Sequence, residues 1–187
     1  MSTREWFIAE ADRLAFVDFE ASGLGDGSFP TEIGWAIVQS GAVISGSRLI
    51  RPQPEWLAAL AAWSPEAEKL TAISLELLDS EGVPASEAAR AFSLATADRL
   101  LLSDNPAFDG FWLAMLFRAA GLSASGIKMG DSIKAIDYAS KNGNITRIDS
   151  MLFELAISKD SPTRHRAEPD ARRQALKWAL TAGIMSP

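Results

Sequence analysis

The chain has 187 residues, a length that suits a single domain, residues 1–187, with a sizeable core. Its formal net charge of −6 argues against a broad basic surface that would hold long duplex DNA, because such binding rests on neutralising phosphates. The chain has no cysteine, which excludes disulfides and thiolate zinc sites, and it shows neither a basic-then-apolar leader nor a membrane-length apolar run, so we expect a cytoplasmic protein without membrane partners.

The first predicted element is a buried strand that begins at Leu14 and is broken by the turn residues 22–24. Asp18 and Glu20 lie inside its apolar run and project from one face, about 7 Å apart, because strand side chains alternate. Two acids this close on a buried segment repel each other unless a cation lies between them. The pair therefore predicts a metal site at a strand end; a solvated edge strand is the alternative for an isolated Asp-x-Glu.

Two further strands are expected over 32–38 and 42–50, linked by a tight turn, so the first three strands predict an antiparallel meander. Beyond the meander, the periodicity of apolar residues alternates between helices and two short strands. The predicted helices cover 55–62, 65–70, 85–97, 107–120, 132–139, 147–157 and 169–181, and the short strands lie near 100–102 and 127–129.

A second chemical feature is Asp109, in the first turn of the helix predicted over 107–120. Phe108 and Trp112 belong to the apolar stripe of this helix, and for Trp112 core packing is favoured over stacking on a base. An acid near a helix N-terminus is favoured by the helix dipole and needs no function. Taken alone, Asp109 therefore fits a structural role at least as well as a catalytic one.

The third feature is the only histidine, His165, which precedes the last predicted helix and its first-turn acid, Asp170. A histidine titrates near neutral pH, so beside a metal site it is a candidate general base, whereas a lone loop histidine usually lies at the surface without a role. The basic residues of the chain concentrate here, either as a phosphate-guiding rim or as a solvated helix face. They are Arg164, Arg166, Arg172, Arg173 and Lys177.

The order of these features, Asp-x-Glu, then Asn-x-x-Phe-Asp, then His-x-x-x-x-Asp, resembles the DEDDh 3′–5′ exonucleases. This family is related to the proofreading subunit of bacterial DNA polymerase III, ribonuclease T and oligoribonuclease. The stretch 20–24 resembles the family pattern E-x-[ST]-G-L, and residues 32–34 match its E-I-G. Two positions depart from the family: Asp104 and Thr71 stand where many members have histidine.

The resemblance implies an α/β, ribonuclease H-like fold with a five-stranded mixed sheet whose first three strands are antiparallel and whose faces are flanked by helices. It also implies two divalent ions, Mg²⁺ or Mn²⁺, with Asp18 bridging both and His165 as the general base. Hard oxygen ligands suit such ions, and a pair of them can stabilise an in-line phosphoryl displacement. The implied metal ligands are Asp18, Glu20, Asp109 and Asp170.

The implied activity is hydrolysis of single-stranded nucleic acid from its 3′ end, with release of nucleoside 5′-monophosphates. Residues Ser22, Gly23, Leu24 and Asn105 are expected to contact the substrate, and Phe29 is a candidate for stacking on a base. Some relatives form homodimers, which makes a homodimer reasonable here. The alternative is a catalytically silent nucleic-acid-binding or scaffold protein of the same fold. No residue decides between DNA and RNA, or fixes substrate length, duplex tolerance or a polymerase partner.

Overall fold

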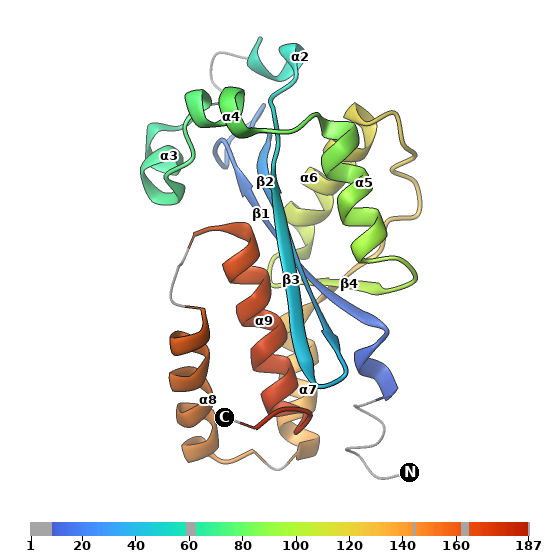
Figure 1. The fold of residues 1–187 in the computed structure, drawn as a ribbon, viewed down its shortest axis with the longest axis vertical. Helices are drawn as coiled ribbons and strands as arrows, with labels where there is room; N and C mark the ends of the chain where they lie inside the picture. The colour runs from blue at the N-terminus through green and yellow to red at the C-terminus, as the bar shows by residue number, and fades with distance from the viewer. Residues whose placement is uncertain (1–8, 59–62, 144, 162–164, 187) are drawn as a thin grey trace.

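One mixed sheet forms the centre of the molecule (Figure 1). The structure, a computed structural model, describes residues 9–58, 63–143, 145–161 and 165–186. The strand order is β3-β2-β1-β4-β5; the first three strands are antiparallel neighbours, whereas β4 runs parallel to β1 and β5 parallel to β4. The predicted five-stranded sheet is confirmed. Its strands are β1 (Leu14–Ala21), β2 (Pro30–Gln39), β3 (Ala42–Leu49), β4 (Leu100–Ser103) and β5 (Met129–Asp131).

The helices of the described residues mostly follow the predicted ranges. One of them, α4, was not predicted; Ser74 caps it by accepting a hydrogen bond from the backbone N–H of Leu77 at 3.1 Å. The helix predicted over 55–62 appears as the short α2, and positions 59–62 lie outside the described residues. The helices are α2 (Pro54–Leu57), α3 (Pro65–Thr71), α4 (Leu75–Glu81), α5 (Ala85–Ala95), α6 (Pro106–Ala119), α7 (Ser132–Gly143), α8 (Arg147–Asp160) and α9 (Ala167–Thr181).

The side chains of β1 alternate between two cores, one on each face of the sheet. Val17 and Phe19 pack into the core that α5 and α6 cover, whereas Phe16 packs against the buried face of α9. Figure 1 shows α9 running alongside the sheet, with α7 and α8 next to it. Asp18 and Glu20 share the parity of Phe16 and therefore project on the side of the sheet that α9 covers.

Two aromatic residues considered for base stacking belong to the interior. Phe29 is 1% exposed, and its ring stacks on Trp56 with the centroids 5.7 Å apart, so its face is covered by the protein itself. Trp112 is also buried, with its ring 6.5 Å from that of Phe19, and the packing role predicted for it is confirmed. Within the described residues, no helix combines the length and apolar character that a membrane span requires.

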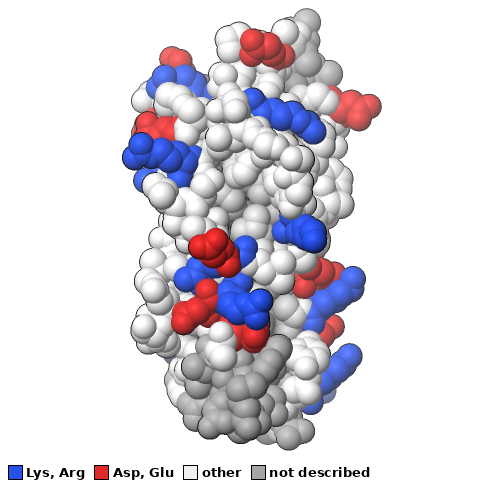
Figure 2. Space-filling model, turned by 90° about the vertical axis from the view of Figure 1, so that its right-hand side faces the viewer, with Lys and Arg blue, Asp and Glu red and all other residues white. Residues whose placement is uncertain are grey.

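Charged side chains of both signs are interspersed on the face shown in Figure 2. Lysine and arginine side chains lie next to aspartate and glutamate side chains, and white, uncharged surface separates the groups. Among its described residues, this face therefore carries no continuous basic field of the kind that holds duplex DNA.

Candidate active site

Strand β1 and helix α9 together form a first group of three carboxylates. Asp18 and Glu20 point toward α9, whose first turn contains Asp170. Each of the three side chains offers an oxygen, and these oxygens lie within 4.8 Å of one another. The predicted convergence of the two strand acids with an acid 150 positions away in the chain is thus present in the folded protein.

A second group of carboxylates shares Asp18 with the first and lies at the end of β4. It consists of Asp18, Asp104 and Asp109, again with oxygens within 4.8 Å of one another. The parallel pairing of β1 with β4 matches Phe16 with Leu102, and two residues further on Asp18, in β1, lies beside Asp104, which directly follows the end of β4. In the sequence Asp104 stands out only as a departure from the family pattern. Its place beside Asp18 depends on the register of β1 against β4, which no local pattern in the sequence gives.

Asp109 is turned inward and held by its own neighbourhood. It is 3% exposed, and the hydroxyl of the fully buried Ser103 donates a short hydrogen bond to its carboxylate. The Ser103 hydroxyl in turn accepts the backbone N–H of Asn105 at 2.8 Å, which fixes the turn between β4 and α6. Asp109 therefore faces Asp18 and Asp104 rather than bulk solvent.

Burial and mutual repulsion raise the pKa values of the central acids. Desolvation raises the pKa of Asp18 well above its ordinary value, and the charges of Asp109, Glu20 and Asp104 raise it further. Desolvation, with the charge of Asp170 next, raises the pKa of Glu20 to about 8. The pKa of Asp109 is raised to about 7 by desolvation, although the hydrogen bond from Ser103 opposes the shift.

These acids fit a pair of divalent cations. Each group offers three hard carboxylate oxygens, the donor type that Mg²⁺ and Mn²⁺ prefer, and the shared Asp18 can serve both groups. Desolvation, with mutual repulsion next, raises the pKa values of Asp18 and Glu20, so bound positive charge would favour the ionised cluster. The residues present therefore suit the two ions implied by the sequence, with Asp104 as an additional oxygen donor.

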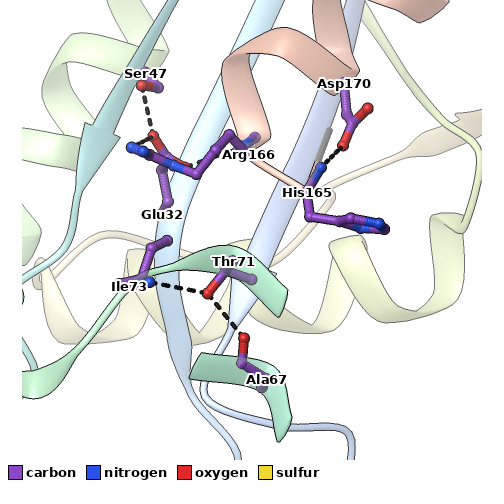
Figure 3. A network of polar contacts seen from close by, with 9 residues as sticks. Glu32, Ser47, Ala67, Thr71, Ile73, His165, Arg166 and Asp170 are labelled. Atoms are coloured by element: carbon purple, nitrogen blue, oxygen red, sulfur yellow. Dashed lines mark hydrogen bonds and ion pairs between the residues drawn. The ribbon is translucent and has the colours of Figure 1, made fainter. Parts of the chain in front are cut away.

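His165 lies at the entrance to α9, next to the first carboxylate group. Its backbone N–H donates to Asp170 Oδ2 at 2.8 Å, and its φ of 56° turns the chain sharply before the helix begins (Figure 3). The side chain is exposed and lines a cavity together with Asp18, Glu20 and Asp170. An imidazole in this position can accept a proton from a water molecule that approaches the acids from solvent.

Two cavities open on the acids and share Asp18, Phe19, Glu20 and Asp104 in their walls. The α9 cavity, of about 530 Å³, has a mixed lining of polar and apolar residues, and its polar members include Ser132, Asp137, His165, Asp170, Arg173 and Gln174. The Leu24 cavity, of about 600 Å³, has a more apolar lining that includes Gly23, Leu24, Leu70, Asn105, Phe108 and Trp112.

Three of the four predicted substrate contacts line the Leu24 cavity. Leu24 is 79% exposed, which leaves an apolar side chain free to touch a ligand, and Gly23 and Asn105 lie in the same wall. Ser22, in contrast, is buried, and its hydroxyl accepts the backbone N–H of Phe29 at 2.9 Å. The structure thus places the Ser22 side chain in the loop that presents Leu24, and not among the residues that line the cavity.

The basic residues near α9 are mostly engaged with protein groups. Arg172 pairs with Asp160 at 2.7 Å, and Arg173 donates to the carbonyl of Ser161 at 2.6 Å. Lys177 also forms an ion pair, and only Arg173 and Lys177 of the described members line the α9 cavity. A rim that guides phosphates is therefore limited to these two among the described residues, and Arg164 lies outside them.

Comparison with known proteins identifies the fold. No family model and no curated protein sequence matches the chain. Solved structures of Escherichia coli exonuclease I do match. The complex with a dA16 oligonucleotide has a TM-score of 0.62 and 16% identity, over 89% of this chain and 40% of that one. The chain shares the fold of the matched part of exonuclease I.

Two further structures of exonuclease I from E. coli also match the fold of this chain. The complex with a dT13 oligonucleotide has a TM-score of 0.58 and 17% identity over 91% of this chain and 40% of that one. The zinc-bound complex with single-stranded DNA has a TM-score of 0.60 and 16% identity, over 87% and 38% of the two chains. These matches and the order of the five strands confirm the predicted ribonuclease H-like fold. The chain spans about 40% of the length of exonuclease I.

Proposed function

We propose that this chain is a metal-dependent 3′–5′ exonuclease that acts on single-stranded DNA. The observation that carries the proposal is the pair of carboxylate groups that share Asp18. A single group of three exposed acids is common in proteins, but two partly buried groups joined at one residue are the arrangement that a two-ion phosphodiesterase needs. The chain shares its fold with exonuclease I, whose structures contain dA16 and dT13 oligonucleotides. This likeness supports single-stranded DNA as the proposed substrate.

In this proposal each group of residues has a separate task. Asp18, Glu20 and Asp170 would hold one ion, and Asp18, Asp104 and Asp109 would hold the other. When bound, the ions neutralise the phosphate and stabilise the charge that develops on the attacking and leaving oxygens. The zinc-bound complex of exonuclease I supports a requirement for a divalent ion, and we propose Mg²⁺ or Mn²⁺ for this chain because all the donors are carboxylates.

His165 is the proposed general base. Its imidazole takes the proton of the attacking water, and its exposed position lets it return that proton to solvent between turnovers. Attack on the phosphate between the last two nucleotides releases a nucleoside 5′-monophosphate and leaves a new 3′-hydroxyl on the shortened strand. Repetition of this step shortens the strand one nucleotide at a time.

The Leu24 cavity is the proposed site of the 3′-terminal nucleotide. The exposed Leu24 and Phe108 form its apolar walls, and the stacking of an aromatic ring such as that of Phe108 on a base contributes about 1–3 kcal/mol. Trp112, whose ring packs beside that of Phe108, also lines this cavity. Asn105 is the proposed contact to the sugar or the phosphate of this nucleotide. The homodimer expected from the sequence stays a prediction.

The test uses a 5′-labelled single-stranded oligonucleotide with Mg²⁺ or Mn²⁺, with and without chelator. We expect a ladder of products that shorten stepwise, and nucleoside 5′-monophosphates as the released product. A matched oligonucleotide with a blocked 3′ end should stay intact, and an RNA of the same sequence measures the preference for the sugar. Binding without digestion of either polymer would instead favour the silent nucleic-acid-binding alternative.

A further inference from the structure

A buried ion pair ties the start of α9 to strand β2. Glu32 is 1% exposed, and its carboxylate accepts two hydrogen bonds from the Arg166 guanidinium, from Nε at 2.8 Å and from Nη2 at 3.0 Å (Figure 3). It also accepts the hydroxyl of Ser47 at 2.8 Å and the backbone N–H of Ala167 at 3.1 Å. A bidentate contact of this kind fixes the orientation of the guanidinium relative to the carboxylate as well as the distance between them.

Glu32 supplies a cap that α9 lacks within its own segment. Arg166 occupies the N-cap position and makes no side-chain capping bond, so the first N–H groups of the helix need an acceptor from elsewhere. The carboxylate of Glu32 accepts the N–H of Ala167, and its negative charge lies at the positive end of the helix dipole. The beginning of α9 is therefore defined by a residue that lies 135 positions earlier in the chain.

Gly34 fixes how closely α9 approaches the sheet. A Cβ atom at this position would lie 2.1 Å from the carbonyl carbon of Ala167, a distance that no side chain tolerates. Glu32 and Gly34 face the same side of β2, two residues apart. Ser45 on the neighbouring strand also donates a hydrogen bond to Glu168. Glu32 and Gly34 of the Glu-Ile-Gly motif thus form a seat for the first turn of α9.

This seat lies directly beside the acids. Glu32 is paired with Glu20 across β1 and β2, so both side chains project from the same face of the sheet. His165 directly precedes Arg166, and Asp170 lies four residues after Arg166, within the first turn of α9. Any tilt of this turn moves the imidazole and the Asp170 carboxylate relative to Asp18 and Glu20.

We propose that Glu32 and Arg166 are positioning residues that hold His165 and Asp170 at the acids of β1. The proposal rests on the proposed function, since the catalytic value of this geometry depends on it. In this role neither Glu32 nor Arg166 touches the substrate or an ion. The Glu32 carboxylate accepts hydrogen bonds from Arg166, Ser47 and Ala167. The pair therefore acts through the turn that it fixes.

The experiment compares Glu32→Gln and Arg166→Lys with a matched control, Arg172→Met. Arg172 also anchors α9, through Asp160 at 2.7 Å and the carbonyl of Val43 at 2.9 Å. It reaches the first turn only indirectly, through the hydroxyl of Ser45 at 3.4 Å, which donates to Glu168. Four quantities are measured on each full-length variant: melting temperature, kcat and KM on a labelled single-stranded oligonucleotide, Mn²⁺ affinity, and the imidazole NMR signal. Because the chain has one histidine, that signal reports on His165 alone.

We expect both test variants to lower kcat by about 10–100-fold, the usual loss when a group that supports a metal site is removed, with KM changed by less than about twofold. The His165 signal should shift, and Mn²⁺ should broaden it less than in the parent. Arg172→Met should lower the melting temperature while leaving kcat and the His165 signal as in the parent. If Glu32→Gln does not fold, the milder Arg166→Lys decides.

A parent-like kcat and His165 signal in both test variants would overturn the proposal, as would equal losses in Arg172→Met. A parent protein that binds no Mn²⁺ and digests nothing would refute the proposed function instead. In that case the His165 signal and the melting temperatures still show whether Glu32 and Arg166 hold the turn, because neither measurement depends on catalysis.

Discussion

Helices α6 and α9 each deliver an acid from their first turn to the same site, but they are held there in different ways. Asp109 of α6 is held by Ser103, which lies six residues earlier in the chain, at the end of the strand that leads into the helix. The turn that carries Asp170 is held by Glu32, which lies 134 residues before its partner Arg166. One half of the site is therefore assembled by its own connection, whereas the other half needs the completed sheet.

This difference has a consequence for robustness. A local anchor such as Ser103 forms whenever β4 and α6 form, because the short connection keeps its partners close. A distant anchor such as Glu32 is only in place once β2 and α9 have packed together. The α9 half of the site is thus more sensitive to substitutions that leave the acids themselves untouched.

The largest effect is expected at Asp18, the residue that the two halves share. Asp18→Asn should abolish exonuclease activity, because both groups lose a charged ligand at once. Product formation on a labelled oligonucleotide and Mn²⁺ binding by calorimetry measure the loss. The exposed Asp79 on α4 offers a matched control, and Asp79→Asn should behave as the parent. Substantial activity in Asp18→Asn would show that the two groups do not act as one site.

The next effect tests the α9 half. His165→Ala should slow cleavage by about 10²–10⁴-fold, the usual contribution of a general base. Since the side chain is exposed, the melting temperature should stay within about one degree of the parent value. Single-turnover rates measure the chemical step, and retained Mn²⁺ affinity shows that the carboxylates are intact. A rate equal to that of the parent would remove His165 from the mechanism.

A smaller effect is expected in the α6 half from Asp104, the acid that the sequence analysis left unassigned. Asp104→Asn should weaken the binding of one of the two ions by about tenfold, at the low end of losses in metal sites, because this side chain is exposed. Calorimetric titration with Mn²⁺ separates the two binding events. If both Mn²⁺ affinities are unchanged, Asp109 and Asp18 bind that ion without help from Asp104.

The smallest effect concerns stability and pH. The pKa of Glu20 is raised from 4.5 to about 8 and that of Asp109 from 3.8 to about 7, so the folded state holds more protons than the unfolded state between these limits. Stability without metal should therefore fall as the pH rises from about 5 to 8. Melting curves at several pH values measure this, and Mg²⁺ should raise the melting temperature more at pH 8 than at pH 6.

Asp18→Asn provides the control for this last prediction. It removes a repelling charge from both groups, so the loss of stability with rising pH should become shallower, and the stabilisation by Mg²⁺ should disappear. A parent protein whose melting temperature rises between pH 5 and 8 without metal would contradict the raised pKa values of the central acids.

The sequence by itself determined the parts of the site that depend on neighbouring residues. The alternation of β1 placed Asp18 and Glu20 on one face, and the turn chemistry after them placed the acids at a strand end. The antiparallel meander also follows from short connections, which allow few other pairings. The resemblance to a family joined Asp109, His165 and Asp170 to this pair, although each of them has a plausible structural role when taken alone.

Only the tertiary structure decided the contacts between distant segments. Asp104 joins the acids because β4 pairs with β1 in a particular register, and Phe29 is enclosed because Trp56 folds over it. Glu32 caps a helix that begins more than a hundred residues later. Periodicity and capping patterns report on residues within a few positions of each other, whereas these contacts depend on how complete elements pack, and packing is set by the whole core.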